Sequence, residues 1–383
     1  MKWKCKMAVC ILVLVLSTGC WDSKIIQNYM YISALGIDYK DKEYTVYFQF
    51  MDLAGISKSE SGSSSQPKNT TWTGKAAGPT LNMAFYNMIK LSQQPILWSH
   101  IKMMVFTPAA LEIGIMPLSK GVTGQRDLRY TSQLYGTQSN LEELFSIPTN
   151  SNTTLINSLL MRPGLVLKQY SYFKPVNLQD FLLNANKNYA TFAIPVVAIK
   201  EGAWSKSESG KDQSTPVIDG VMMLRGEKYR GSFDGATVSG MRWLNKEAII
   251  DPLLLKKGDR NVAILQIERP KVKIQFANLD KKPAFSLHLR FSATVVEMLS
   301  SENEAELKRL AEQQIKADIL DTFKATIVKD VDLFNVEEIF HRKHQKQWKE
   351  WFQNNHFRWN KDSLTSINVT IKLKHAGTNY LGE

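Results

Sequence analysis

The sequence predicts an α+β protein with two or three domains. Runs in which apolar and polar residues alternate, the pattern of strands with one buried face, occur in both halves of the chain. Runs with apolar residues at helical spacing are mixed among them in each half. The chain has 383 residues, of which 44% are hydrophobic, so it is too long for one small core and ordinary in composition for a globular protein.

The N-terminal half is predicted to start with a hairpin. Residues 29–39 are rich in β-forming side chains, and in 43–53 apolar residues such as Val46 and Phe48 alternate with polar ones. The other predicted elements of this half are a helix that opens at Pro79 and Thr80, strands at 96–106, 130–136 and 192–199, and short helices at 140–147, capped by Asn140, and at 154–161.

The C-terminal half is predicted to contain the longest helix of the chain. Ser301 and Glu304 have the spacing of a capping box, and apolar residues then recur every four positions from Leu307 to Ile327. The other predicted elements are two strands within 217–233 joined at 226–228, strands at 261–268 and 272–276 separated by Arg269 and Pro270, a strand at 285–298, an amphipathic segment at 336–352 and a closing strand at 365–374.

Two polar stretches interrupt this pattern, at 54–75 and at 201–216, and both are predicted to be loops. The second of them is the first predicted domain boundary. The predicted organisation is a signal peptide at 1–19, an N-terminal α+β region at 20–200, a polar linker at 201–216, a small middle domain at 217–260, and a C-terminal α+β domain at 261–383 with its long helix at 302–329.

The first residues have the pattern of a secretory signal. Three lysines, at positions 2, 4 and 6, precede an apolar run from Met7 to Leu16. A helix of that length would span about 15 Å, which is half of a bilayer core of roughly 30 Å. The run is therefore typical of a secretory signal rather than of a transmembrane helix.

A cysteine at the predicted cleavage point suggests a lipid anchor. Ser17, Thr18 and Gly19 precede Cys20, and small residues before a cysteine are typical of a lipobox, although the usual leucine lies one position further back here, at Leu16. Cleavage between Gly19 and Cys20 would leave Cys20 as the N-terminus, with a diacylglyceryl group on its sulfur. The alternative is an ordinary secretory signal with a chance cysteine. Trp21 and Asp22 would then lie next to the membrane, where an indole ring is favoured at the headgroup level.

Composition restricts the function further. Cys5 and Cys10 would leave with the signal, so Cys20 would be the only cysteine of the exported protein and no disulfide could form. The net charge is +12, and the loss of the three signal lysines would leave +9. Such a surface could approach anionic lipid headgroups, or its charges could simply be dispersed in solvent. Nucleic acid is not an expected partner of an exported protein.

No catalytic or cofactor motif is evident. The sequence has no phosphate loop, no dinucleotide-binding glycine pattern and no nucleophile elbow. His341 and His344 have metal-ligand spacing, but neighbouring basic residues would repel a cation, so a solvated basic face is favoured. No cofactor and no metal are therefore predicted, apart from the covalent lipid on Cys20. The aromatic residues between 348 and 359 could form a partner surface, although packing near the long helix is the favoured interpretation.

Several motifs together resemble the Ger(x)C family of spore germination lipoproteins. The opening Cys20-Trp21-Asp22, followed by a strand that ends at Gly36-Ile37-Asp38, is similar to the start of that family. The order of the later segments is similar as well, although Ser23-Lys24-Ile25 and the Ser-rich loop after Gly55 depart from the family pattern. The later segments are 97–106, 220–231, 239–244 with Trp243, 283–297 and 348–374.

The resemblance implies a fold and a role. The implied fold is a multi-domain α+β array with three mixed sheets flanked by helices. The implied role is the non-enzymatic C subunit of a nutrient germinant receptor, a lipoprotein that acts with integral membrane A and B subunits to trigger germination. The implied location is the outer face of the cell membrane or of the spore inner membrane. The resemblance assigns nutrient contact to no residue of this subunit.

Two other functions are compatible with an exported lipoprotein. An extracytoplasmic solute-binding lipoprotein would need two lobes of alternating strands and helices, and the predicted hairpins at 29–53 and 217–233 argue against it. A lipid-anchored cell-wall hydrolase would need a carboxylate, metal or nucleophile cluster, and the sequence shows no such pattern.

Overall fold

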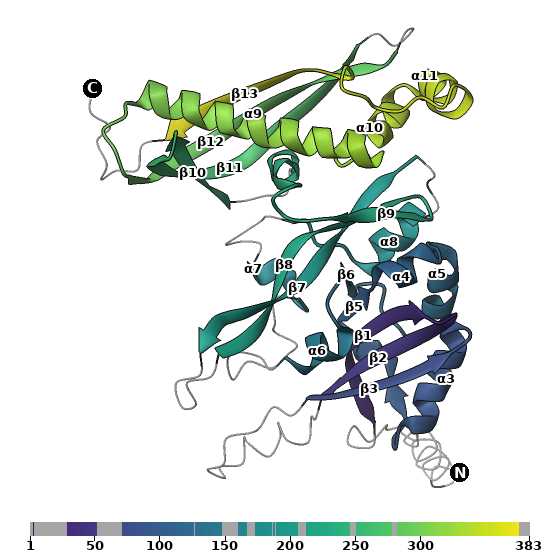
Figure 1. Cartoon of the computed structure of the whole chain (residues 1–383). Helices are drawn as coiled ribbons and strands as arrows, with labels where there is room; N and C mark the ends of the chain where they lie inside the picture. The colour runs from purple at the N-terminus through teal and green to yellow at the C-terminus, as the bar shows by residue number, and fades with distance from the viewer. Residues whose placement is uncertain are drawn as a thin grey trace.

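The computed structural model of the chain describes two sheets, and a long antiparallel ribbon that belongs to the first sheet lies between its other strands and the second sheet (Figure 1). The described residues are 3, 29–51, 71–125, 127–147, 160–166, 173–185, 187, 189–205, 212–245, 250–277 and 282–374.

The first sheet combines antiparallel and parallel pairs. β1, β2 and β3 form an antiparallel ribbon, β1, β5 and β6 are parallel, and β7, β8 and β9 are again antiparallel. The order across the sheet is β3-β2-β1-β5-β6-β7-β8-β9, with β4 also paired to β1. The strands are β1 (Met30–Lys40), β2 (Glu43–Met51), β3 (Thr71–Gly78), β4 (Ile96–Leu97), β5 (Met103–Phe106), β6 (Gln133–Gly136), β7 (Thr191–Ser205), β8 (Asp212–Arg225) and β9 (Lys228–Phe233).

Helices cover this sheet on both faces, because its central strands are apolar on both. In β5, Met104 and Phe106 belong to one core while Met103 and Val105 belong to the core on the other face. The first core contains residues of α3 (Leu81–Leu91), α4 (Pro108–Glu112), α5 (Ile115–Thr123) and α8 (Leu178–Ala185), and the second contains residues of α6 (Leu141–Ser146). A 3-10 turn, η2 (Trp98–His100), and a short helix, α7 (Pro163–Val166), complete this part.

The second sheet is covered by one long helix. β10 (Ile250–Lys257), β11 (Arg260–Ala277) and β12 (Ala284–Met298) are antiparallel, and β13 (Leu364–Lys374) pairs parallel to β12. Apolar residues of α9 (Glu304–Lys329), including Leu307, Ile315 and Ile319, pack on alternate residues of β13, including Val369 and Ile371. The remaining elements are η4 (Ser239–Leu244), which precedes β10, and α10 (Val336–Lys343), α11 (Gln345–Trp348) and the π-helical turn η5 (Lys349–Asn354), which follow α9.

The α+β class is confirmed, and so are most elements. The hairpin at 29–53, the helix after Thr80, the helix capped by Asn140, the turn at 226–227 and the strands at 285–298 and 365–374 are present within a few residues of their predicted bounds. The long helix predicted at 302–329 occupies Glu304–Lys329. Of the helix predicted at 154–161, residues 154–159 lie outside the described residues.

The number of sheets differs from the prediction. We expected three mixed sheets, whereas the described residues form two, because β6 joins β7 where Gly136 pairs with Val196. The sheet pairing also crosses the predicted middle region at 217–260. Its first part, β8 and β9, pairs with β7, while β10 pairs with β11 of the second sheet.

Most wrong predictions of single elements concern polar stretches of the sequence that were predicted as loops but form strands. The stretch 201–216 contributes strand at both ends, since β7 continues to Ser205 and β8 begins at Asp212, and exposed ribbons tolerate polar residues on both faces. Residues 71–75, predicted as loop, are paired with β2. The predicted interruption at Arg269 and Pro270 is a register shift within a continuous β11.

Helix boundaries were also set by contacts that the sequence pattern does not reveal. The N-cap of α9 is Asn303, whose side chain accepts a hydrogen bond from Glu306 N, rather than Ser301. The strand predicted at 96–106 is divided by η2, and the helix predicted at 336–352 is divided at His344. Among the described residues, no helix is both long and apolar enough to cross a membrane.

Candidate functional site at the junction of the two sheets

The predicted lipidation site cannot be compared with the fold. Gly19, Cys20, Trp21 and Asp22 lie outside the described residues, so lipidation and membrane proximity stay predictions. The nearest described strand begins at Met30, at the start of β1. The structure itself points to a different place, the junction between the first sheet and the helices that follow α9.

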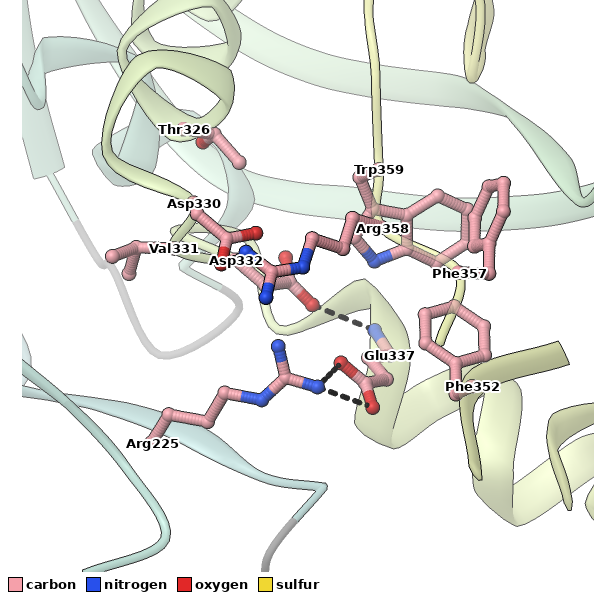
Figure 2. A pocket seen from close by; sticks show the side chains of 10 residues that line it. All are labelled: Arg225, Thr326, Asp330, Val331, Asp332, Glu337, Phe352, Phe357, Arg358 and Trp359. Atoms are coloured by element: carbon pink, nitrogen blue, oxygen red, sulfur yellow. Dashed lines mark hydrogen bonds and ion pairs between the residues drawn. The ribbon is translucent and has the colours of Figure 1, made fainter. Parts of the chain in front are cut away.

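An arginine and a glutamate join the two parts of the molecule. Arg225, the last residue of β8, donates from Nη2 to both carboxylate oxygens of Glu337 on α10, at 2.9 and 2.7 Å (Figure 2). The Glu337 side chain is 2% exposed and that of Arg225 is 24% exposed. Trp348 Nε1 donates a third hydrogen bond to Glu337, at 3.2 Å. A buried carboxylate that accepts three hydrogen bonds, two of them from a cation, is an ordered contact rather than a weak surface pair.

A second carboxyl group lies beside this pair. Asp332 is buried, and its Oδ2 accepts a hydrogen bond from Glu337 N at 2.7 Å, so it supports the first turn of α10 (Figure 2). Burial raises the pKa of Asp332, which backbone hydrogen bonds only partly offset. Burial also raises the pKa of Glu337 to about 7, with Arg225 opposing the shift and the charge of Asp332 adding to it. Proton binding to Glu337 is therefore linked to the junction.

Contacts around the pair come from the same two parts of the chain. Lys187 Nζ lies 3.5 Å from Glu338 Oε1, and Asn335 Oδ1 accepts a hydrogen bond from Thr191 N at 3.4 Å. The ring of Tyr189 stacks on that of His341, with centroids 3.8 Å apart. The segment before β7 and the base of the β7–β8 ribbon thus face α10 along its length.

A second group of polar contacts holds η4, the segment that connects the two sheets, against α9 and β10. Trp243 in η4 is buried, and its Nε1 donates to Asp318 Oδ2 of α9 at 2.9 Å. Arg242 lies between Asp318 and Asp251, at 3.3 and 3.2 Å. Burial raises the pKa of Asp251 to about 6, while Arg242 opposes the shift. Since η4 immediately precedes the second sheet, these bonds fix where that sheet begins.

Glycine at position 240 allows η4 to approach α9. A Cβ built at Gly240 would lie 2.6 Å from Asp318 O and 2.7 Å from Ile319 Cα, so no larger residue fits without movement of the helix backbone. Gly240 N donates to Thr322 Oγ1 at 2.9 Å, and Thr322 Oγ1 donates to Thr237 O. η4 is therefore packed closely against α9.

The cavity at the junction is very small. It has a volume of about 10 Å³, which is enough for one water molecule, and its lining includes Arg225, Asp332 and Glu337 (Figure 2). A wider hollow of about 330 Å³ beside it is lined by Arg225, Glu227, Lys228 and Arg230 and opens to solvent. The charged groups of the junction are paired with each other, so the arrangement is suited to holding two domains together rather than to chemistry on a substrate.

The histidines and aromatic residues that the sequence offered as candidate sites are packed against other side chains. His341 contacts Tyr189 and Trp348, and His344 contacts Phe276 and Phe340, and no potential metal-binding group of three or more side chains occurs among the described residues. The aromatic cluster packs inward as favoured, since Phe352 is buried and Trp359 lies against Phe285 and Phe340.

Sequence reasoning did not find the residues of the junction. Arg225 stands next to a predicted turn, and Asp332 and Glu337 stand near the ends of predicted helices, where charged residues are ordinary. The apolar residues around them, Val331, Leu333 and Val336, were the available signal, because single charges within an apolar stretch are often buried and paired.

Both halves of the chain are similar to known proteins. Residues 22–199 match the family model described as "Spore germination protein N-terminal domain", and residues 219–377 match the one described as "Spore germination B3/ GerAC like, C-terminal". The chain is 19% identical to YfkR of Bacillus subtilis (strain 168), which is named as a spore germination protein, over 82% of this chain and 81% of that protein. A crystal structure of the GerBC protein matches with 13% identity and a TM-score of 0.49, covering 88% of this chain and 96% of the other.

Proposed function

Because this chain belongs to the GerAC family of spore germination proteins, we propose that it is the non-enzymatic, lipid-anchored C subunit of a germinant receptor. In this proposal it acts on the outer face of the membrane with integral membrane A and B subunits. The single observation that carries the proposal is the order of the two family matches, 22–199 and 219–377, directly after a lipobox-like segment that ends at Cys20.

The position of the first match supports the anchor. It begins at Asp22, two residues after the cysteine that would become the lipidated N-terminus. A diacylated cysteine supplies the two acyl chains that stable anchoring needs. Anchoring would also raise the local concentration of the folded domains near membrane partners, so a weak interface with A and B would suffice.

The junction supports a role in passing a conformational signal between domains rather than in catalysing a reaction. Its carboxyl groups are held by Arg225, Trp348 and backbone donors, and its cavity of about 10 Å³ has room for no more than about one water molecule. A receptor subunit needs domains whose relative position is defined, and the contacts of Arg225 and Glu337 define it here. The solute-binding alternative gains no specific support from this geometry.

The test is a Cys20→Ala substitution at the native locus, scored for membrane association and for nutrient-triggered germination. We expect loss of both, while germination triggered by calcium dipicolinate is retained because it acts downstream of the receptor. Cys10→Ala is the matched control, since that residue would be removed with the signal. Unchanged nutrient germination with a released protein would contradict the proposed role of the anchor.

A further inference from the structure

The edge of the first sheet at which its parallel strands begin has an unusual surface. β1, β5 and β6 run parallel, so their first residues lie at one edge, which we call the strand-start edge. The loop after α3 reaches the same edge, since Met30 N donates to Pro95 O at 2.9 Å and Met30 pairs with Ile96. In Figure 1 the end of α3 and the start of β1 lie in the half of the molecule away from the second sheet.

The outer face of α3 is apolar where a surface helix is normally charged. Its inner residues, such as Phe85 and Met88, pack on the sheet, yet Leu91 is 67% exposed, Tyr86 60% and Ile89 40%. The helix has one charged residue, Lys90, and no acidic one.

The helix on the second sheet shows the usual arrangement. The exposed positions of α9 include Arg309, Asp321 and Lys324, which form ion pairs with neighbours along the helix. α9 exposes Leu320 and Val328 as well, but they lie among these charged residues, whereas the exposed Tyr86, Ile89 and Leu91 of α3 have Lys90 as their one charged neighbour on the helix.

Basic and amphipathic residues extend this surface beyond α3. Tyr130, just before β6, is 52% exposed, and Arg129 next to it is also exposed. Lys102 stands directly before β5, and Ser132 Oγ donates to the carbonyl oxygens of Ile101 and Arg129 at 2.7 and 2.8 Å, so both cations stand at this edge. His100 lies against Tyr31 near the start of β1, with centroids 4.9 Å apart.

The first strand after Cys20, β1, begins at this same edge. Met30 is ten positions after Cys20, and ten residue steps can extend over at most about 35 Å. If Cys20 is held in the bilayer, the start of β1 must lie within that distance of the lipid surface. Tyrosine and apolar side chains flanked by Lys and Arg form the chemistry that favours a membrane interface with anionic headgroups.

We propose that the strand-start edge lies on an anionic lipid surface, with Ile89, Leu91 and Tyr130 in the headgroup region. Lys90, Lys102 and Arg129 face the anionic headgroups, and the second sheet points away from the bilayer. This inference rests on the lipid anchor of the proposed function. It adds an orientation of the folded domains, which an anchor at Cys20 does not by itself define.

A probe on α3 tests the orientation. The lipidated protein without its signal, in which Leu91→Cys supplies the one free thiol, is labelled with an environment-sensitive fluorophore and placed in vesicles of phosphatidylglycerol and phosphatidylcholine. We expect a blue-shifted emission that nitroxide-labelled lipids quench and aqueous iodide quenches several-fold less than for the control. The control is Val328→Cys, on α9 and 81% exposed, which should be quenched by iodide alone.

Two results would overturn the inference while the anchor holds. Equal iodide quenching at positions 91 and 328, in protein that stays with the vesicles, would show that the edge does not touch lipid. Protection from iodide without quenching by the nitroxide lipids would show that protein covers the edge instead.

A second arm separates this inference from the anchor. The Cys20→Ala protein should bind anionic vesicles weakly, and Leu91→Glu with Tyr130→Glu should reduce that binding at least about three-fold, whereas Val328→Glu should not. No difference between these variants would count against the edge. Membrane release on Cys20→Ala tests only the anchor, so the two failures can be told apart.

Discussion

Arg225 binds both carboxylate oxygens of Glu337, and these residues stand at the ends of two different parts of the fold, a strand of the first sheet and a helix beside the second. The pair is more buried on the glutamate side, where Asp332 and Trp348 complete the hydrogen bonds. Removing either member leaves the other without its main partner. The stability of the junction should therefore depend on both members together.

Arg225→Ala is expected to destabilise the protein by about 3 kcal/mol, because it leaves a buried carboxylate without its cation. Urea unfolding of the purified protein measures this. Lys324→Ala, which breaks an exposed pair with Asp321 on α9, is the control and should change stability by less than about 1 kcal/mol. Equal effects of the two substitutions would contradict the importance of the junction.

Glu337 should make stability depend on pH in an unusual direction. Its pKa is about 7 in the folded protein, against an ordinary value of 4.5, so between these values the folded state binds more protons than the unfolded state. Stability should therefore fall as pH rises from about 5 to 7, by at most about 1.4 kcal/mol per unit from this group. Asp251, with a pKa of about 6, acts in the same direction.

The histidines His100 and His341, whose pKa values are lowered by burial, oppose this trend on acidification. The contribution of Glu337 is therefore obtained by difference. We expect Glu337→Gln to lose part of the gain in stability that the wild-type protein shows between pH 7 and pH 5 in urea unfolding. Identical pH profiles for the two proteins would show that Glu337 does not titrate in this range.

Gly240→Ala should destabilise the protein by roughly 1–3 kcal/mol, because the new methyl group would lie against the backbone of Asp318 and Ile319. Gly164→Ala is the matched control, since nothing lies within 4 Å of a Cβ at that position. Thermal unfolding of both variants compares them directly. A neutral Gly240→Ala would mean that η4 is not packed tightly on α9.

The start of α9 provides a clear comparison of two caps. Asn303→Ala should cost about 1 kcal/mol, because Asn303 Oδ1 accepts the hydrogen bond of Glu306 N. Ser301→Ala should have almost no effect, since Ser301 lies outside the capping position. The difference in urea midpoints of the two variants measures this, and the reverse order would support the capping box that the sequence suggested.

Local patterns predicted most of the elements correctly. The alternation in β2 and β13, the four-residue apolar spacing of α9 and the Asn140 cap each arise from neighbours a few residues apart, so they can be seen in the sequence. The prediction of a loop at 201–216 was wrong at both ends of that stretch. A two-stranded ribbon is held by cross-strand hydrogen bonds and needs no apolar face, so its strands leave no apolar pattern in the sequence.

Residue patterns were enough to establish the α+β class, the main strands and helices and the resemblance to the family, and they predict an anchor at Cys20. The pairing of Gly136 with Val196, the contact of Arg225 with Glu337 and the packing of Gly240 on α9 became visible in the folded structure alone. These contacts join residues that are far apart in the sequence. Periodicity reports which face of an element is buried, but the partner of a buried charge or a close backbone contact lies far along the chain and is set by the packing of whole elements.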